Sequence, residues 1–532
     1  QVFEDQLDGV VPHIDDDFFS LGLDSIVAIS LVHKARRRGL TVSPRMVVNA
    51  RTIRQLAAAI DDAGSPTALE SAEFGEVLPL PMVSWLYEYG NYRRFTNTVL
   101  LRLPAEIDCS SMESVLQALL DGHDTLRSML TDSHEGPRLV TREPGVVRAA
   151  DLLTRVELPE STDAELNLAI THSARRAIDE IDPHAGAMVR AVWFSGAQSG
   201  ELLLVIMHHL VVDVVSWHIM LGDLAAAWGS VKSGAAPKTL PEFTSYRRWS
   251  ELMWKRAAMP EVAAQRDYWM SQVRGSDSAL GVRHPDPTRD TWSSLRVAEV
   301  VVPVADTQRV LGILTRDEGM REFLLAVTTI AVTSWRRECA QDPASGTLIA
   351  LDSHGRADGV LDTDTTNTVG WFTSAFPVRL GVGLAVDIGR AEDDPRVARG
   401  LLDSVTAHLA AVPNEGLDYG LLHYVCRVPE LQEAAEPQIM FSYLGRLDLN
   451  GVTDQPWLPL TGSHSAAVPV APEPDLPLRF ALYISAHVRG TSEGPQLVTS
   501  VLWSDVLFAE SDIDRLTYFW RRGIVALVAG LA

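Results

Sequence analysis

The chain contains few cysteines, which excludes two kinds of cysteine-based architecture. Its three cysteines, Cys109, Cys339 and Cys426, lie far apart in 532 residues. An odd number of cysteines without metal-ligand spacing argues against both a disulfide framework and a zinc knuckle. We therefore expect a protein of a reducing compartment, with the cytoplasm as the default.

The chain also has few positively charged residues and only short apolar stretches. The chain has 46 lysines and arginines against 69 aspartates and glutamates, a net charge of -23. Because no basic patch with interleaved aromatic residues is visible, we expect neither nucleic acid nor a membrane surface as a partner. The longest apolar stretches fall short of the roughly 20 residues that a membrane-spanning helix needs. The start, "QVFEDQ", lacks a signal-peptide pattern and is typical of a piece excised from a longer protein.

The chain is long enough for two or three packed units of ordinary composition, with 46% hydrophobic and 22% charged residues. A short helical pattern comes first, and the acidic, small-residue stretch "DDAGSPTALESAEFGEVLP" follows it. Strand-like runs then alternate with helical patterns, which is typical of an α/β domain. The expected boundaries are a helical domain at 1–64, a linker at 65–77, and an α/β domain at 78–532 with an N-lobe at about 78–255 and a C-lobe at about 256–532.

The first candidate site is a serine at the start of a helix. In "DDFFSLGLDSIVAIS", Ser25 precedes a run in which Ile26, Ile29 and Val32 share one helical face. A phosphoester on this serine would meet the free N–H groups and the positive dipole end of the helix. The residues alone also allow Ser25 to be a simple helix cap.

The second candidate site is "HHLVVDVVSW" at 208–217, which follows the apolar run "LLLVIM". Successive side chains of a strand point to opposite faces, so His208 and His209 are poorly placed to hold one metal ion together. We expect one histidine to face the core and the other a cleft, with Asp213 in the turn before a helix. A catalytic corner and plain packing both remain possible for such a pair.

The wider sequence resembles a fragment of a nonribosomal peptide synthetase. "LGLDS" is similar to the peptidyl carrier motif, whose matching serine, here Ser25, carries 4′-phosphopantetheine. "HHLVVDVVSW" resembles the signature of the condensation superfamily, an α/β two-lobed fold similar to chloramphenicol acetyltransferase. Further segments resemble its epimerization branch: "LPLPMVSWL", "HDTLR", "LDSHGRADG", "NTVGWFTSAFPVRL", "PNEGLDYGLL" and "FSYLGR". The resemblance implies a small four-helix carrier domain followed by an epimerization domain.

This resemblance implies L-to-D inversion at the α-carbon of an aminoacyl or peptidyl thioester on the carrier. One group must remove the α-proton and another must return a proton to the opposite face. Carried over position by position, the implied catalytic residues are His209, Asp352 and Tyr443. The residues implied to support the site are His208, Asp213, Ser216, Trp217, His354, Arg356, Asn367, Trp371 and Ser442. The implied partners are a phosphopantetheinyl transferase, an upstream adenylation domain and a downstream condensation domain.

Several motif positions depart from the family pattern. Asp352 stands in place of a glutamate, and a misplacement of about 1 Å can cost about 100-fold in rate. Val214 replaces a glycine, which predicts backbone strain if that position needs a positive φ. Asn367 replaces an arginine, which predicts a buried Asp213 without its partner. Two further replacements are Ser442 for an asparagine and Asp418 for a glycine.

These departures leave three hypotheses open. The chain is an active epimerase, a degenerate epimerization-type domain kept for carrier docking, or a condensation-type domain with another reaction on the tethered chain. The epimerization-branch motifs argue against amide formation, and the legible site motifs favour an active enzyme slightly.

Overall fold

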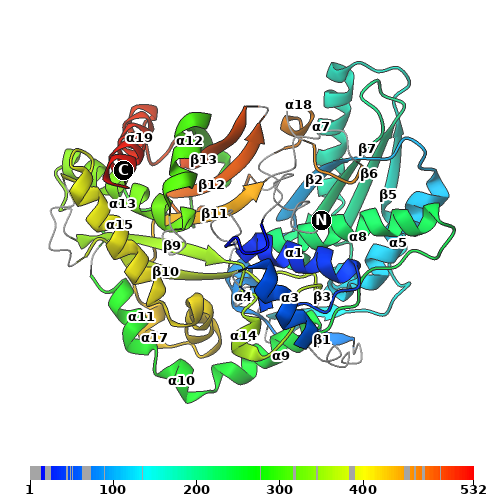
Figure 1. Ribbon diagram of the computed structural model, residues 1–532, viewed down its shortest axis with the longest axis horizontal. Coiled ribbons are helices and arrows are strands. Elements are labelled where there is room, and N and C mark those ends of the chain that lie inside the picture. The colour runs from blue at the N-terminus through cyan, green and yellow to red at the C-terminus, as the bar shows by residue number, and fades with distance from the viewer. Residues whose placement is uncertain are drawn as a thin grey trace. The chain divides into compact units, whose positions relative to one another are not determined.

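In a computed structural model, the chain forms two compact units, each assembled from several stretches of sequence (Figure 1). The first unit comprises Gln1–Lys255, Arg356–Thr373 and Leu449–Glu473. The second comprises Arg256–Gly355, Ser374–Asp448 and Pro474–Ala532. The structure describes residues 13–17, 25–43, 46–47, 50, 52–62, 74–88, 90–134, 136–275, 277–314, 319–342, 345–382, 390–447, 456–460, 463–469, 474–491 and 493–531. The sequence predicts a continuous C-lobe, whereas the structure assigns two later segments to the first unit, because they pair with its strands and polar side chains.

The N-terminal helical region contains α1 (Ser25–Arg37) and α3 (Ile53–Asp62). Helix α1 is followed by Gly39, whose φ of +81° is the left-handed conformation that ends many helices. One buried apolar cluster joins this region: Leu31, Val32, Ala35, Val42, Val47, Ala50 and Leu56. The four helices expected for this domain fall partly on residues outside the described ranges.

The first unit is built on a four-stranded sheet with the order β2-β7-β6-β5. Strand β7 pairs antiparallel with β2 and β6, while β5 pairs parallel with β6. The strands are β2 (Thr96–Arg102), β5 (Leu153–Glu157), β6 (Val189–Ser195) and β7 (Leu202–His208). Every residue of β7 is buried, as expected for a central strand that is covered on both faces.

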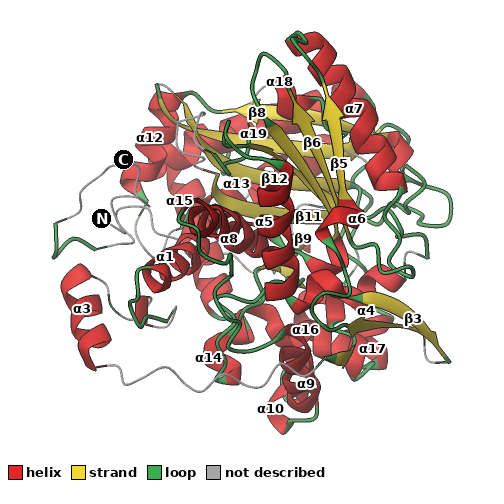
Figure 2. Cartoon of the chain, turned by 90° about the vertical axis from the view of Figure 1, so that its right-hand side faces the viewer, coloured by secondary structure: helices red, strands yellow, loops and turns green. Residues whose placement is uncertain are grey.

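Helices cover both faces of this sheet, and the alternation along β7 shows how. Leu202, Leu204 and Ile206 join the apolar cluster of α7 (Asp163–Asp179), which lies alongside the strands in Figure 2. Val205 and Met207 point the other way, toward α5 (Cys109–Gly122) and α8 (Val214–Lys232). The apolar run before the histidine pair is therefore the buried strand that leads directly into α8.

Shorter elements complete the first unit around this sheet. A three-stranded sheet has the order β1-β4-β3, with all pairs antiparallel. Its strands are β1 (Gly75–Val77), β3 (Met129–Ser133) and β4 (Gly136–Thr141). The remaining helices here are α4 (Pro81–Tyr87), η1 (Asp124–Arg127), α6 (Ala149–Leu152), η2 (His209–Val211), α9 (Tyr246–Ala257), α14 (Asp358–Leu361) and α18 (Ser463–Ala466).

The second unit is built on a six-stranded sheet with the order β10-β9-β11-β12-β13-β8. Strand β11 runs parallel to β9 and β12, and the other pairs are antiparallel. The strands are β8 (Leu295–Val301), β9 (Thr347–Ser353), β10 (Ser374–Leu380), β11 (Ile439–Leu447), β12 (Leu482–Thr491) and β13 (Gly494–Ser504).

Helix α13 (Met320–Glu338) is the central helix of the second unit. All its residues from Phe323 to Arg336 are buried, so the helix is enclosed on every side. Thr328 and Thr329 satisfy their hydroxyls by donating to carbonyls one turn earlier, at 2.8 Å each.

Among the described helices, none is long and apolar enough to cross a membrane. The other helices here are α10 (Pro260–Ala263), α11 (Arg266–Val273), η3 (Trp292–Ser294), α12 (Val304–Ile313), α15 (Pro395–Ala410), η6 (Pro413–Gly416), α16 (Leu417–Gly420), η7 (Leu421–Val425), α17 (Pro429–Gln432) and α19 (Glu510–Leu531).

Candidate active site

His208, the last residue of β7, holds the corner in place through its ring nitrogens. The backbone N–H of Leu210 donates to Nδ1 at 3.1 Å, and Nε2 lies 2.9 Å from the carbonyl oxygen of Tyr92. An acceptor at Nδ1 and a donor at Nε2 define the neutral tautomer. Burial, the main cause, lowers the pKa of His208 to about 3. His208 is therefore a neutral, hydrogen-bonded structural residue.

His209 is held between two aromatic rings. Its imidazole stacks on Phe95 with centroids 5.1 Å apart, and the ring of Trp371 lies 4.5 Å away on a tilted plane. The backbone N–H of His209 donates to the Phe95 carbonyl at 2.8 Å, which fixes the residue from a second direction. Nδ1 is buried and makes no hydrogen bond within the described residues. Burial lowers the pKa of His209, so its neutral form is the one suited to accept a proton near pH 7.

Asp213 is committed to hydrogen bonds inside the first unit. It is the N-cap of α8, and its Oδ1 accepts from the Ser216 N–H at 2.7 Å. Its Oδ2 accepts from the Phe372 N–H at 3.1 Å, and Nη2 of Arg356 lies 3.2 Å from Oδ1. Asp213 thereby joins the start of α8 to the 356–373 segment, the segment that also carries Trp371.

Arg356, and not residue 367, supplies the positive charge beside Asp213. Its Nη1 donates to the carbonyls of Thr365 and Thr368 at 2.7 Å each, and its guanidinium lies 4.1 Å from the Phe372 ring centroid. The expectation that Asn367 leaves Asp213 unpaired is therefore wrong. A second arginine already neutralises the aspartate, and Asn367 makes other contacts.

The first turn of α8 contains two further predicted positions. Val214 is 40% exposed and is the first residue of the helix, and it is not among the described residues with positive φ. The strain predicted for Val214 is therefore absent, since its backbone is helical. Trp217 is partly buried and lines the apolar cavity between β7 and α8 together with Met207 and Met220. Ser216 Oγ donates to the Gly370 carbonyl at 2.9 Å, a second tie to the 356–373 segment.

Asp352 lies in the second unit, beside Ser442. Phe441 of β11 is in register with Leu351 of β9, which places the next residue of each strand side by side. The Ser442 hydroxyl donates to Asp352 Oδ2 at 2.5 Å. Burial raises the pKa of Asp352 to about 6, against the opposing effects of the Ser442 hydrogen bond and the Arg321 charge. A carboxyl group with this pKa exchanges a proton close to neutral pH.

Tyr443 lies on β11, and His354 directly follows β9. Side chains alternate along a strand, so Tyr443 belongs to the face of β11 opposite Ser442. A register shift follows Tyr443 on β11. His354 follows the end of β9 and is partly buried. The structure thus brings Asp352 and Ser442 together but does not place Tyr443 on their face of the sheet.

Asp418, the other departure in this unit, is a buried ion-pair residue. It accepts from Nε of Arg256 at 2.5 Å, from Gln265 Nε2 at 2.6 Å and from Asn414 Nδ2 at 2.7 Å. These bonds hold the tight turn in which Asn414 has a φ of 47°. The replacement of glycine by Asp418 therefore has a local structural role.

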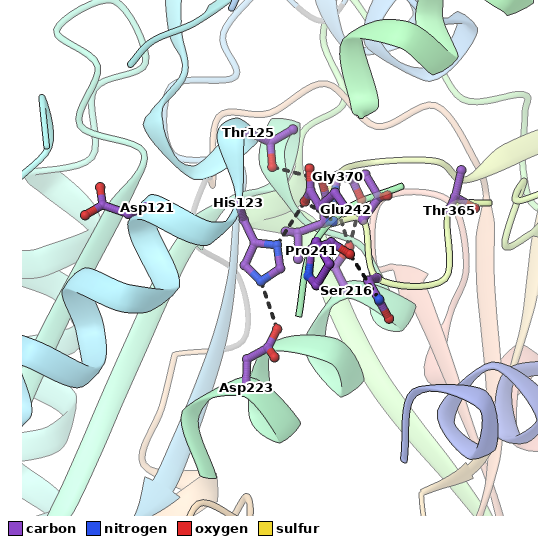
Figure 3. A network of polar contacts seen from close by, with 12 residues as sticks. Asp121, His123, Thr125, Ser216, Asp223, Pro241, Glu242, Thr365 and Gly370 are labelled. Atoms are coloured by element: carbon purple, nitrogen blue, oxygen red, sulfur yellow. Dashed lines mark hydrogen bonds and ion pairs between the residues drawn. The ribbon is translucent and has the colours of Figure 1, made fainter. Parts of the chain in front are cut away.

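Sequence reasoning missed a buried polar network around His123, which Figure 3 shows. Nε2 of His123 lies 2.9 Å from Asp223 Oδ2, and Nδ1 lies 2.9 Å from Glu242 Oε1. Burial by itself lowers the pKa of His123, but the hydrogen bonds and charges of the two carboxylates raise it to about 9. His123 is thus an imidazolium that donates to two carboxylates. The available signal was Asp223, a charged residue within the apolar pattern of the helix at 214–232.

Ser25 is the first residue of the 13-residue helix α1, and its side chain lies outside the described residues. A phosphodiester at this position would meet the N-terminal N–H groups of the helix. This placement fits the attachment of 4′-phosphopantetheine. No group of three or more potential metal ligands occurs within the described part of the chain.

Comparison with known protein families identifies both parts of the chain. The condensation-domain family matches residues 89–528, and the phosphopantetheine attachment site family matches residues 2–60. The second match indicates that the chain carries covalently bound 4′-phosphopantetheine. A linear gramicidin synthase of Brevibacillus parabrevis is 28% identical over 97% of this chain and 6% of its own length. Chondramide synthase of Chondromyces crocatus is 30% identical over 82% of this chain and 11% of its own length. The chain thus spans a small fraction of these relatives.

Solved structures share the fold at low sequence identity. The epimerization domain from the third module of tyrocidine synthetase B has a TM-score of 0.71 at 22% identity, covering 88% of this chain and 99% of its own. The X-domain from teicoplanin biosynthesis has a TM-score of 0.62 at 17% identity, with coverages of 88% and 97%. The first condensation domain of the calcium-dependent antibiotic synthetase has a TM-score of 0.59 at 16% identity, with coverages of 87% and 98%. The chain belongs to the condensation-domain family of nonribosomal peptide synthetases and includes a phosphopantetheine-attachment domain.

Proposed function

We propose that the chain inverts the α-carbon of an aminoacyl or peptidyl group tethered to Ser25, from L toward D. The observation that carries this proposal is the environment of His209, a neutral imidazole clamped by Phe95 and Trp371. The likeness to an epimerization domain at a TM-score of 0.71, against 0.59 for a condensation domain, supports the same reaction. The proposed partners are a phosphopantetheinyl transferase, an upstream adenylation domain and a downstream condensation domain.

The chemistry needs an acidic proton on the α-carbon and two proton-transfer groups. A thioester linkage supplies the first, because sulfur donates poorly into the carbonyl and leaves the α-proton more acidic than in an amide. His209 accepts or returns a proton at one face, since its buried ring favours the neutral form at rest. The aromatic clamp restricts the ring to one orientation, which proton transfer requires.

Asp352 is the proposed second proton-transfer group. Its pKa of about 6 keeps both its protonated and its ionised form populated near neutral pH. The Ser442 hydroxyl stabilises the ionised form by donating to Oδ2. Tyr443, which belongs to the opposite face of β11, is assigned no step in this reaction.

The degenerate-domain alternative is weaker than the sequence suggests. Two features that would favour a degenerate domain are backbone strain at Val214 and an unpaired Asp213, and the structure contains neither. The shorter side chain of Asp352 is the remaining argument, and its hydrogen bond to Ser442 gives it a defined position. Within the described ranges, no specific contact favours a condensation-type reaction other than epimerization.

Deuterium wash-in at the α-carbon tests the proposal. Candidate L-aminoacyl and dipeptidyl arms are attached to Ser25 of the full chain and incubated in heavy water, and the released product is analysed for mass and chirality. We expect deuterium uptake with D product, and a loss of about 10²- to 10⁴-fold in rate in His209→Ala. His208→Gln is the matched control for loss of corner structure. No uptake with any arm, together with uptake restored by Asp352→Glu, would make the domain a silenced epimerase.

A further inference from the structure

Helix α1 of the carrier presents a histidine and two arginines on one face. His33, Arg36 and Arg37 are spaced by three and four residues, which places them together on a helix. Arg37 forms an ion pair with Asp223 of α8, and its Nε donates to His33 Nε2 at 3.1 Å. Nδ1 of His33 then lies 3.1 Å from Asn367 Oδ1. These contacts join the carrier to the two segments that hold the Asp213 corner.

The acidic partner of Arg37 is completely buried. The Asp223 side chain is 0% exposed, and so is its neighbour His123. Without Arg37, two carboxylates, Asp223 and Glu242, would share the single imidazolium of His123 in a site with little access to water. Removing one member of such a buried group is strongly unfavourable, because it leaves an uncompensated charge. The surface around Asp223 therefore requires a positively charged side chain from the docked carrier.

A second ion pair lies at the edge of the same contact. Nη1 and Nη2 of Arg36 lie 3.1 and 2.5 Å from the two carboxylate oxygens of Asp364, a bidentate arrangement. The side chains are 12% and 30% exposed, and the guanidinium also lies 5.0 Å from the Phe243 ring centroid. A partly exposed pair of this kind contributes mainly orientation and partner choice.

The contact surface continues into the elements that hold His209. Asn367 Nδ2 donates to the Pro241 carbonyl at 3.1 Å, and the Val369 N–H donates to Glu242 at 3.1 Å. Trp371, which packs on His209, lies two residues further along the same segment. A carrier seated on this surface therefore contacts the segment that positions the histidine clamp.

We propose that Asp223, Asp364 and Asn367 form a carrier-recognition surface that selects a carrier helix with a histidine and two arginines at the spacing of His33, Arg36 and Arg37. Asp223 is the discriminating residue and Asp364 the orienting one. His123 is a positioning residue that holds the Asp223 carboxylate. The inference deepens the proposed function, because it names the carrier chemistry that the proposed epimerase accepts.

A distance measurement in the full chain tests the surface without relying on catalysis. Nitroxide labels at Leu40→Cys and Lys232→Cys, both exposed positions, report the separation of the carrier from the end of α8. The three native cysteines are replaced by serine, and Ser25 carries its phosphopantetheine arm. We expect a single narrow distance distribution by double electron–electron resonance. A broad distribution in this parent chain would overturn the proposal.

Variants identify the residues that hold the carrier. Arg37→Gln and Asp223→Asn should each reduce the narrow population by at least about tenfold, and the double variant should lose no more than either single one. Arg54→Gln, the same charge change at an exposed arginine whose ion pair is with Asp15, should leave the distribution narrow. Equal broadening in Arg54→Gln, or additive losses in the double variant, would contradict a specific Arg37–Asp223 contact.

A charge exchange at the edge of the surface completes the test. Arg36→Glu and Asp364→Arg should each broaden the distribution, and the two together should restore it, because both positions are partly exposed. If the exchanged pair does not restore the narrow distribution, Asp364 is not part of the recognition surface. A chain that passes these tests but shows no deuterium wash-in keeps the recognition surface and loses the proposed epimerization. If wash-in occurs while the distance distribution is unaltered in every variant, the chain keeps the proposed epimerization and loses the recognition surface.

Discussion

Two buried aspartates on the same helix, Asp213 and Asp223 of α8, are each neutralised by an arginine, but the arginines come from different places. Asp213 pairs with Arg356, which lies in the same domain and donates to neighbouring carbonyls as well. Asp223 pairs with Arg37 of the carrier. Asp213 is thus paired with an arginine of its own domain, whereas Asp223 keeps His123 as a partner and gains Arg37 only while the carrier is seated. Helix α8 thus carries one permanent structural pair and one pair that forms when the carrier docks.

The largest effect is expected from Asp213→Ala. This change leaves Arg356 buried without its carboxylate and removes the N-cap of α8. We expect the free energy of unfolding to fall by about 3–5 kcal/mol, with deuterium wash-in lost as Trp371 leaves His209. Thermal unfolding followed by circular dichroism measures the change. A destabilisation no larger than that of Asp223→Ala would end the distinction between the two aspartates.

A smaller effect on stability, with a large effect on docking, is expected from Asp223→Ala. The change removes the partner of Arg37 but leaves His123 paired with Glu242. We expect wash-in on the tethered arm to slow by at least about tenfold, because the carrier leaves its seat more often. The comparison of rates for loaded full chains measures it. Unchanged wash-in would show that Arg37 and Asp223 have no part in delivering the substrate.

The pH dependence of stability sharpens the contrast further. Burial lowers the pKa of His123, but its two carboxylates raise it from 6.5 to about 9. A raised pKa means that its stabilising contribution is complete below pH 6.5 and is lost as the pH rises toward 9. We expect the free energy of unfolding to fall over that window, as measured by denaturant unfolding at several pH values, and His123→Gln to remove the dependence. A fall that begins below pH 6.5 would point to another group.

A third aspartate, the partly buried Asp352, extends the comparison, because it has a serine where the other two have arginines. The wash-in rate should show an inflection near pH 6, the pKa that burial gives this carboxyl group. Ser442→Ala removes the hydrogen bond that lowers this pKa, so the inflection should move to higher pH. Asp352→Asn should abolish it. An inflection that survives in Asp352→Asn belongs to a different residue.

The smallest effect is expected from Val214→Gly, which restores the residue typical of the family. Val214 is exposed and helical, so glycine there should cost about 0.5–1 kcal/mol of unfolding free energy and leave wash-in unchanged. Thermal unfolding and the exchange assay together measure this. A marked gain in wash-in would revive the idea that Val214 impairs the site.

The sequence predicted most of what depends on local pattern. The apolar run before His208 indicated a buried strand, and Asp213 was placed in the turn before a helix, because both features repeat within a few residues. The return of the 356–373 segment to the first unit was not predictable in this way. It depends on Arg356 reaching Asp213 across 143 residues of chain.

The prediction for residue 367 shows why the remaining site was missed. Motif comparison treated Asn367 as a lost arginine, since a single sequence does not show which side chain neutralises a buried acid. The structure places that role on Arg356 and gives Asn367 a contact with His33, 334 residues away. The network of His123, Asp223 and Glu242 was hidden for the same reason. Its members are separated by 100 and 119 residues and meet only in the folded chain.

The most direct test of the proposed epimerization approaches equilibrium from both directions. Full chains are loaded on Ser25 with the same amino acid in its L form and, separately, in its D form, and the ratio of the two forms is measured over time. We expect both samples to reach the same ratio, and neither to change in His209→Ala. Samples that keep the configuration with which they were loaded, in a chain whose carrier is seated, would contradict it.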